Sequence, residues 1–447
     1  MAGLPERVAT IVIVLVVPAA APLATQARTP LAAVEADEGR EATPPDSRRP
    51  VVVAAFTRES YRPGQVARLV VTGYAAGVTL QIYRAGTDPA WVHANDLMTG
   101  AAVTDPTELG GVHGRRAFAV TLGPWASGVY FVKLTARGGR IGYAPFVLAP
   151  RVLGLHHVAV VIATQTWQAY NFRDSHHDGH GDTWYADRRR RTARLGRPFL
   201  NRGTPPHWKS NDLPFLQWLE ASGRTADYLA DSDLGSVRSA ARLRSAYRLV
   251  VFPGHHEYVT TREYDVITGF RNRGGHLIFL SANNFFWRIV RHGNVMTRTR
   301  RWRELGRPEA ALIGVEYFRN DRGQHRAPWV VRPSPTDDWL LWHSGLAPGS
   351  RVSSGGIEAD RTTTDSPRNI KIVAEIPNLY GPGLTAQMTF YETRRGAQVF
   401  AVGAFGFTGA ATDPRVARVL ANLWRRLGGL RAAEKSLPHR PETLTAR

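Results

Sequence analysis

Residues 247–275 read YRLVVFPGHHEYVTTREYDVITGFRNRGG, and this stretch decides the expected fold. The apolar run YRLVVF predicts a buried strand, and the TTRE motif that begins at Thr260 has the pattern of a capping box at a helix start. A strand that leads into a helix is typical of α/β proteins, which place their chemistry at the carboxyl ends of such strands. Glu257 lies at that position. Glu257 either takes part in chemistry or has a structural role. In the second case its carboxylate accepts hydrogen bonds from nearby backbone N–H groups or from His255 or His256.

The alternation of buried strands and amphipathic helices extends over residues 151–430. Runs such as HHVAVVIAT, ADYLA and HLIFLSA have the composition of buried strands, and helical patterns lie between them. This rhythm predicts an α/β domain of three layers, in which helices cover both faces of a mostly parallel sheet. Residues 291–369 have weak periodicity, and we interpret them as an insertion over the sheet or as part of a lid.

Residues 51–150 have a different pattern, because short β-rich runs such as ARLVVTG, VTLQIYRAG and VYFVKLTA alternate with turn residues. Roughly six strands in this length predict an antiparallel β-sandwich of immunoglobulin-like size. The preceding residues 28–50 are rich in Ala, Pro, Glu and Arg, and they predict a disordered linker. Residues 431–447 predict a flexible tail.

The start of the chain has the features of an export signal. Arg7 precedes an apolar run from Val8 to Val17, and small residues follow the run. The run is too short for a comfortable membrane span, although a retained anchor is the alternative. We therefore predict a signal peptide over residues 1–27 and a secreted or extracytoplasmic protein without a membrane span after cleavage.

The composition restricts the chemistry. The chain has 447 residues and no Cys, which excludes thiolate nucleophiles and thiolate metal sites, so a metal must use oxygen or imidazole ligands. The net charge of +20 comes mainly from Arg, and it favours adhesion to acidic surfaces. No motif for sequence-specific nucleic-acid recognition occurs, and neither do the GxSxG or glycine-rich phosphate motifs.

Three further polar residues follow predicted strands. Tyr170 ends the TWQAY stretch after the first strand of the α/β region, Asn283 follows HLIFLS, and Glu392 ends MTFYE. Because parallel strands bring their carboxyl ends to one edge, Tyr170, Asn283 and Glu257 could converge there. The alternatives are that Tyr170 packs at a domain interface, Asn283 caps a helix and Glu392 is an exposed charge.

The segment SHHDGHGD, residues 175–182, crowds three His and two Asp together. It lacks the helical spacing of HExxH zinc sites and contains two Gly, so we favour a flexible surface loop with at most weak metal binding.

The blocks TWQAYN, GHHEY and SANNFFWR together resemble the C-terminal domain family of the N,N-dimethylformamidase large (beta) subunit. The closing QVFAVGAFGFTG and NLWRRL blocks agree with this resemblance, which extends over residues 51–427 and is strongest from His156 onward. For the fold, the resemblance implies a glutamine-amidotransferase-like α/β domain, in which GHHEY occupies the position of the usual nucleophilic Cys.

For the chemistry, the resemblance implies a mononuclear iron (Fe3+) that two tyrosines and one glutamate hold. The matching positions are Tyr130 in GVYFVKL, Tyr170 in WQAYN and Glu257 in GHHEY. Phenolates and a carboxylate are hard oxygen ligands that suit a ferric ion, and three protein ligands leave positions for water and substrate.

The supporting residues that the resemblance implies are Glu392 as general base and Asn283 or His255 as oxyanion stabiliser. Together these features predict an exported, iron-dependent hydrolase of amide C–N bonds. Its expected partner is a small-molecule amide, and a homo-oligomer is left open. The rival interpretation is a non-catalytic extracellular protein that binds a carbohydrate or a cell-surface polymer.

Overall fold

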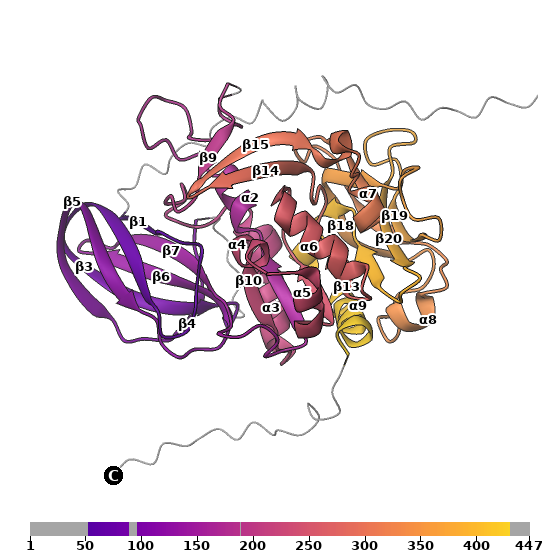
Figure 1. Ribbon diagram of the computed structural model, residues 1–447, viewed down its shortest axis with the longest axis horizontal. Coiled ribbons are helices and arrows are strands. Elements are labelled where there is room, and N and C mark those ends of the chain that lie inside the picture. The colour runs from indigo at the N-terminus through magenta and orange to yellow at the C-terminus, as the bar shows by residue number, and fades with distance from the viewer. Residues whose placement is uncertain (1–51, 89–95, 188, 430–447) are drawn as a thin grey trace, which may run out of the picture.

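The computed structural model describes residues 52–88, 96–187 and 189–429 (Figure 1). The predicted signal peptide, linker and tail lie outside these residues. The described part contains two regions: an N-terminal β domain, drawn in indigo and purple, and a larger domain in which sheets and helices are mixed. No helix among the described residues is long and apolar enough to cross a membrane.

Seven strands form the N-terminal domain, in the order β1-β3-β6-β7-β2, with β4 and β5 also paired to β3. Their bounds are β1 (Val53–Phe56), β2 (Ser60–Tyr61), β3 (Val66–Ala85), β4 (Gly100–Ala102), β5 (Thr107–Thr121), β6 (Gly128–Ala136) and β7 (Arg140–Leu148). The long strand β3 pairs with β1 and β5 along its first half and with β6 along its second half. The sheet therefore folds over along β3 and encloses one apolar core.

An eleven-stranded sheet forms the centre of the larger domain, in the order β10-β8-β11-β13-β21-β20-β19-β17-β18-β16, with β22 paired to β18. The bounds of the strands from β10 to β21 in this order are β10 (Asp227–Ala230), β8 (Val158–Ile162), β11 (Leu249–Phe252), β13 (His276–Phe279) and β21 (Gln398–Ala401). These five strands are parallel to one another. The remaining strands are antiparallel to their neighbours: β20 (Ala386–Glu392), β19 (Lys371–Ile376), β17 (Arg326–Val331), β18 (Arg351–Arg361), β16 (Glu316–Asn320) and β22 (Ala404–Phe405).

The predicted fold class, a three-layer α/β domain with a mostly parallel sheet, is therefore wrong. Strands make up 38% and helices 20% of the described residues, and the sheets are mixed or antiparallel. The prediction failed because residues 291–369, interpreted as an insertion or lid, contribute β16, β17 and β18 to the main sheet. Register shifts interrupt the pairing of these strands, so the alternation of apolar and polar residues that marks a strand is broken there.

Helices cover both faces of the parallel strands. Apolar residues of α5 and α6 pack on one face, and those of α3 and α9 pack on the other. The predicted capping box is confirmed, since Thr260 and Glu263 each bond the other's backbone N–H at the start of α6. The helix bounds are α2 (Thr164–Ala169), α3 (Leu213–Ala221), α4 (Asp231–Gly235), α5 (Ala240–Ala246), α6 (Thr261–Arg271), α7 (Ala310–Ile313), α8 (Asp337–Leu340) and α9 (Pro414–Leu423), with shorter or irregular turns at η1 (Trp208–Asp212), η2 (Trp302–Leu305), η3 (Thr408–Ala410) and η4 (Trp424–Gly428).

A second, four-stranded sheet arches over the carboxyl ends of the parallel strands (Figure 1). Its order is β12-β14-β15-β9, with bounds β12 (Tyr258–Thr260), β14 (Trp287–His292), β15 (Val295–Arg301) and β9 (Thr192–Arg194). Aromatic residues from this sheet and from the segment after α2 form a separate apolar cluster. This cluster encloses the side of the molecule on which Glu257 lies.

The N-terminal domain covers the outer edge of the main sheet. β10 is the last strand at that edge, and Ser127 Oγ accepts a hydrogen bond from the backbone N–H of Tyr228 on β10 at 2.8 Å. Nearby, Arg62 and Asp233 form an ion pair of 3.0 Å between the domains. The two domains are thus joined by both backbone and charged contacts.

Candidate active site

Three oxygen-bearing side chains meet at the carboxyl end of β11. Tyr170 Oη donates a hydrogen bond to Glu257 Oε2 at 2.8 Å. Tyr185 Oη lies 3.1 Å and 2.9 Å from the two carboxylate oxygens of Glu257 and 2.9 Å from Tyr170 Oη. All three residues are buried. The structure therefore gathers two phenol oxygens and one carboxylate into a single cluster, which we call the Tyr-Tyr-Glu cluster.

The backbone of Glu257 is held by two other segments. Its N–H donates to Thr166 Oγ1 of α2 at 3.2 Å, and its carbonyl accepts from the N–H groups of Phe286 and Trp287 at 3.0 and 2.9 Å. Tyr170 follows α2 directly. Because α2, the β11 loop and the loop after β13 are tied together here, the cluster is fixed by the fold rather than by the side chains alone.

Tyr185 lies in the segment between α2 and β9, which is anchored directly before the residue. Thr183 Oγ1 donates to the carbonyl of Ala169, and Trp184 Nε1 donates to Tyr258 Oη at 3.2 Å. The ring of Tyr185 also stacks on that of Tyr170, with centroids 4.4 Å apart. The sequence analysis missed Tyr185, and the only signal for it is the pair of large aromatics in DTWY directly after the His-rich segment.

A second layer of polar groups lies beside the cluster. His255 Nε2 is 3.7 Å from Glu257 and 3.2 Å from Glu358 Oε2, which comes from the antiparallel strand β18. Burial lowers the pKa of His255 to about 4, against the opposing attraction of Glu257, so its ring is neutral near pH 7. Asn283 donates its backbone N–H to Asp360 at 2.9 Å, and its side-chain Oδ1 is buried without a hydrogen-bond partner among the described residues.

Of the six residues that the sequence suggested, the structure brings Tyr170 and Glu257 into the cluster and His255 beside it. Asn283 lies on the loop that follows β13, and its backbone N–H donates to Asp360 of β18 at 2.9 Å. Two residues are elsewhere. Tyr130 lies in the core of the N-terminal domain, where its Oη donates to the carbonyl of Ala126 and burial raises its pKa to about 12.

Glu392 lies at the opposite edge of the sheet from the cluster. It ends β20, which is antiparallel to β21, and it pairs with Gln398 at the start of β21. Since β21 runs parallel to β13, this position is at the amino ends of the parallel strands. The carboxylate of Glu392 accepts a hydrogen bond from Gln398 Nε2 at 2.8 Å. The glutamate that approaches His255 is Glu358 instead.

The His-rich segment forms a loop that is closed by its own contacts. Asp182 is buried and binds the N–H of Ser175 at 2.9 Å and the ring of His176 at 2.7 Å, whereas His177 and His180 are exposed. Within the described ranges, no group of three or more His, Asp or Glu side chains could hold a metal ion.

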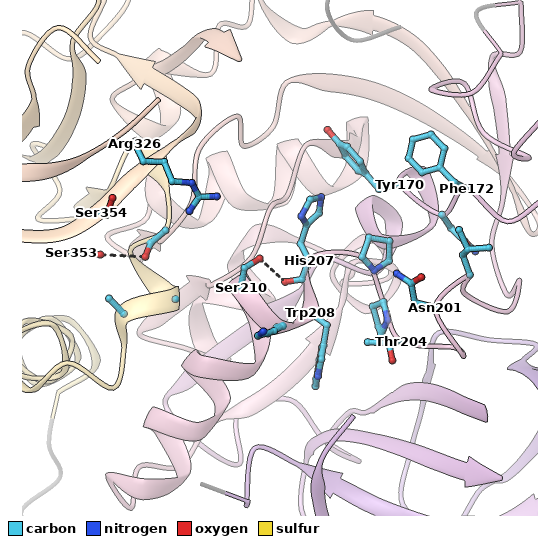
Figure 2. A pocket seen from close by; sticks show the side chains of 18 residues that line it. Tyr170, Phe172, Asn201, Thr204, His207, Trp208, Ser210, Arg326, Ser353 and Ser354 are labelled. Atoms are coloured by element: carbon cyan, nitrogen blue, oxygen red, sulfur yellow. Dashed lines mark hydrogen bonds between the residues drawn. The ribbon is translucent and has the colours of Figure 1, made fainter. Parts of the chain in front are cut away.

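A pocket of about 640 Å³ opens beside Tyr170 (Figure 2). Its walls come from the segment after α2, from residues 200–210, from the start of β17 and from the loop residues near Gly406. The ring of His207 faces that of Tyr170 edge-on, with centroids 5.4 Å apart, and His207 has a left-handed φ of 59°. A strained residue at this place is consistent with a site that needs a fixed side-chain position.

Asp212, which ends the η1 turn, is a buried carboxyl group that should make the stability of the protein depend on pH. It is 2% exposed, its Oδ2 accepts a hydrogen bond from Trp167 Nε1 at 3.1 Å, and burial raises its pKa to about 7. The folded protein therefore binds a proton that the unfolded chain releases near its ordinary value. The contribution of protonated Asp212 to the free energy of unfolding is therefore complete at low pH and is lost as the pH rises through about 7.

We expect Asp212 to lower the free energy of unfolding by on the order of 2–3 kcal/mol between pH 5 and pH 8. Urea denaturation at both pH values should show a smaller decrease for Asp212→Asn than for the wild type, and the exposed Asp338→Asn serves as the control. Identical pH dependence in the wild type and Asp212→Asn would contradict the assignment.

A buried cluster of oxygen-bearing side chains at the carboxyl ends of parallel strands, next to a pocket, has the arrangement of a candidate active site. The chain belongs to the N,N-dimethylformamidase beta subunit-like, C-terminal family, whose model matches residues 79–417. The predicted resemblance is thereby confirmed.

Two relatives illustrate how far the similarity extends. The N,N-dimethylformamidase beta subunits of Alcaligenes sp and Paracoccus aminophilus are each 23% identical to this chain over 313 residues. The matched part covers 56% of this chain and 41% of each relative. The chain thus corresponds to about two fifths of the length of these relatives.

Two similar solved structures each match only a small part of the chain. A cycloisomaltooligosaccharide glucanotransferase of Paenibacillus sp. is 13% identical, covers 28% of this chain and 18% of its own, and has a TM-score of 0.17. A sporulation control protein of Bacillus subtilis is 14% identical, covers 23% and 49%, and has a TM-score of 0.16. At these TM-scores the likeness carries no argument about this chain.

Proposed function

We propose that this protein is an iron-dependent hydrolase of amide C–N bonds, with Tyr170, Tyr185 and Glu257 as the protein ligands of the iron. The observation that carries the proposal is the Tyr-Tyr-Glu cluster, in which three oxygen side chains lie within hydrogen-bond distance of one another. Membership of the dimethylformamidase family supports the reaction type. We further propose that the protein acts outside the cytoplasm, because the start of the sequence resembles an export signal.

The donor set fits this metal. Phenolate and carboxylate oxygens are hard ligands that suit a ferric ion, and the chain has no Cys to offer a softer one. Tyr185 takes the place that Tyr130 holds in the prediction from the sequence, because Tyr185 contacts Glu257 whereas Tyr130 bonds within its own domain. When bound, the ion would supply Lewis acidity toward the amide carbonyl and lower the pKa of a bound water.

The surrounding side chains would orient the substrate and move protons. His255 and Glu358, 3.2 Å apart, can hold or pass a proton beside the cluster. The side-chain oxygen of Asn283 can accept a hydrogen bond from a substrate N–H. In the overall reaction, water adds a hydroxyl group to the acyl carbon, the C–N bond breaks and the amine nitrogen takes the proton.

The test is the metal content and visible spectrum of the protein purified without a His tag. We expect about one iron per chain, a phenolate-to-iron band in the visible region and release of formate from formamides. Colourless, metal-free protein that takes up no iron and hydrolyses no amide would overturn the proposal. That result would favour the binding-protein interpretation, for which retention on carbohydrate or cell-wall polymers is the corresponding measurement.

A further inference from the structure

The charged side chains that line the pocket beside Tyr170 are all positive. Its described lining residues include the cations Lys209 and Arg326 and no Asp or Glu. A concave wall of low polarity strengthens the field of such charges, because fewer water molecules screen them. A ligand of this pocket therefore meets a positive environment, whatever reaction takes place at the Tyr-Tyr-Glu cluster.

Arg326 is the residue on which the charge depends most. It begins β17, it is exposed, and it has no hydrogen-bond or ion-pair partner in the described part of the chain. Arg303 and Arg62, in contrast, form ion pairs with Glu309 and Asp233. A guanidinium offers two parallel N–H donors to a carboxylate, so an unpaired one in a pocket wall is suited to recognise that group.

The backbone beside Arg326 is held in place. Ser353 has a left-handed φ of 54°, and its Oγ donates to the carbonyl of Gly406 at 3.3 Å across the pocket floor. In Figure 2 the guanidinium of Arg326 points from the side of Ser353 and Ser354 toward His207. The cation thus faces the interior, on the side of the pocket away from Phe172.

The remaining walls are largely apolar. Phe172, Leu200, Pro205 and Trp208 are among the lining residues, and Figure 2 shows Phe172 on the side of Tyr170. A volume of about 640 Å³ is within the range for ligands of drug size and leaves room beyond a minimal formamide. The ligand that matches these walls has an amide, an apolar body and an anionic group at the far end.

We propose that the substrate is an N-acyl amino acid, whose carboxylate binds Arg326 while its amide reaches the Tyr-Tyr-Glu cluster. This inference rests on the proposed amide hydrolysis and specifies its substrate class. Water supplies the hydroxyl group to the acyl carbon, the C–N bond breaks, and the products are a carboxylic acid and the free amino acid. Lys209 adds a second positive charge to the lining of the same pocket.

The experiment compares N-formyl-L-leucine with its neutral analogue N-formyl-L-leucinamide. Formate release gives kcat and KM, and calorimetric titration of the purified protein gives affinity without requiring turnover. For the wild type, we expect the anionic compound to have the lower KM and Kd. In Arg326→Gln, both constants should rise tenfold or more for N-formyl-L-leucine, which corresponds to about 1.4 kcal/mol, and change little for the amide. Arg326→Lys should retain part of the preference.

The matched control is Arg137→Gln, which removes an exposed arginine after β6 in the N-terminal domain. Equal affinity of the wild type for the two compounds, or equal effects of Arg326→Gln on both, would overturn the substrate assignment while hydrolysis of either one upholds the proposed function. If neither compound is hydrolysed by iron-loaded protein, the proposed function fails. Calorimetry then still decides whether Arg326 binds the carboxylate.

Discussion

Tyr185→Phe is expected to lose bound iron and amide hydrolysis, whereas Tyr130→Phe is expected to keep both. The two substitutions remove the same hydroxyl group from buried tyrosines in different places. Tyr185 Oη contacts both carboxylate oxygens of Glu257, and Tyr130 Oη donates to a backbone carbonyl in the N-terminal domain. Changing a residue that only supports a metal ligand costs about 10–100-fold in affinity or activity. Removing a ligand should cost at least as much.

Iron per chain, the visible band and formate release measure this difference directly. Thermal unfolding of both variants is the control, because each loses a buried hydrogen bond worth about 1 kcal/mol and both should remain folded. Loss of iron from Tyr130→Phe together with full iron in Tyr185→Phe would restore the ligand set that the sequence resemblance implies.

Gly203→Ala, which adds one methyl group at the domain interface, is expected to lower the stability of the protein strongly. Gly203 has a φ of +94°, and a Cβ there would lie 1.9 Å from the carbonyl oxygen of Tyr143 on β7. The obstacle is backbone, which cannot rotate away, and Tyr143 N also donates to the carbonyl of the adjacent Arg202. We expect a loss of about 3 kcal/mol or more, from backbone strain and overpacking together.

Gly223→Ala is the matched control, because Gly223 also has a positive φ, +63°, but a Cβ there would meet nothing within 4 Å. It should cost only the backbone term of about 1–2 kcal/mol. Urea denaturation of both variants gives the difference, which isolates the contact with Tyr143. Equal losses of stability would mean that the backbone at Tyr143 moves away from the added Cβ without a loss of free energy, and would contradict the prediction.

The turn that carries Glu257 was predictable because its signals are local. The strand, the capping box and the helix of residues 247–271 depend on neighbours within a few residues, and the structure contains all three. The direction of the later strands depends on pairing between distant segments. The pattern of apolar residues within β17 or β18 does not indicate whether a strand pairs parallel or antiparallel with its neighbour. The antiparallel half of the sheet could therefore not be predicted.

The same physics explains which site residues were predictable. Glu392 and Glu358 both lie on strands of the antiparallel half, and only strand direction and register decide which one reaches His255. Tyr185 lies in an irregular segment, where no repeat marks the direction of a side chain. Tyr170 and Glu257 lie within eight residues after the ends of the parallel strands β8 and β11, and at such positions the place in the sequence determines which edge of the sheet a residue occupies.

The hydrogen bond between Ser127 and Tyr228 closes part of the exposed edge of the main sheet. An open edge strand offers unpaired N–H and C=O groups to any other chain, and β10, which is buried and apolar after Asp227, would be a template for such pairing. Ser127 occupies the outward N–H of Tyr228, and the N-terminal domain covers the strand. The β domain thus protects the sheet against aggregation, so the domain that bears the Tyr-Tyr-Glu cluster depends on its neighbour for solubility as well as for packing.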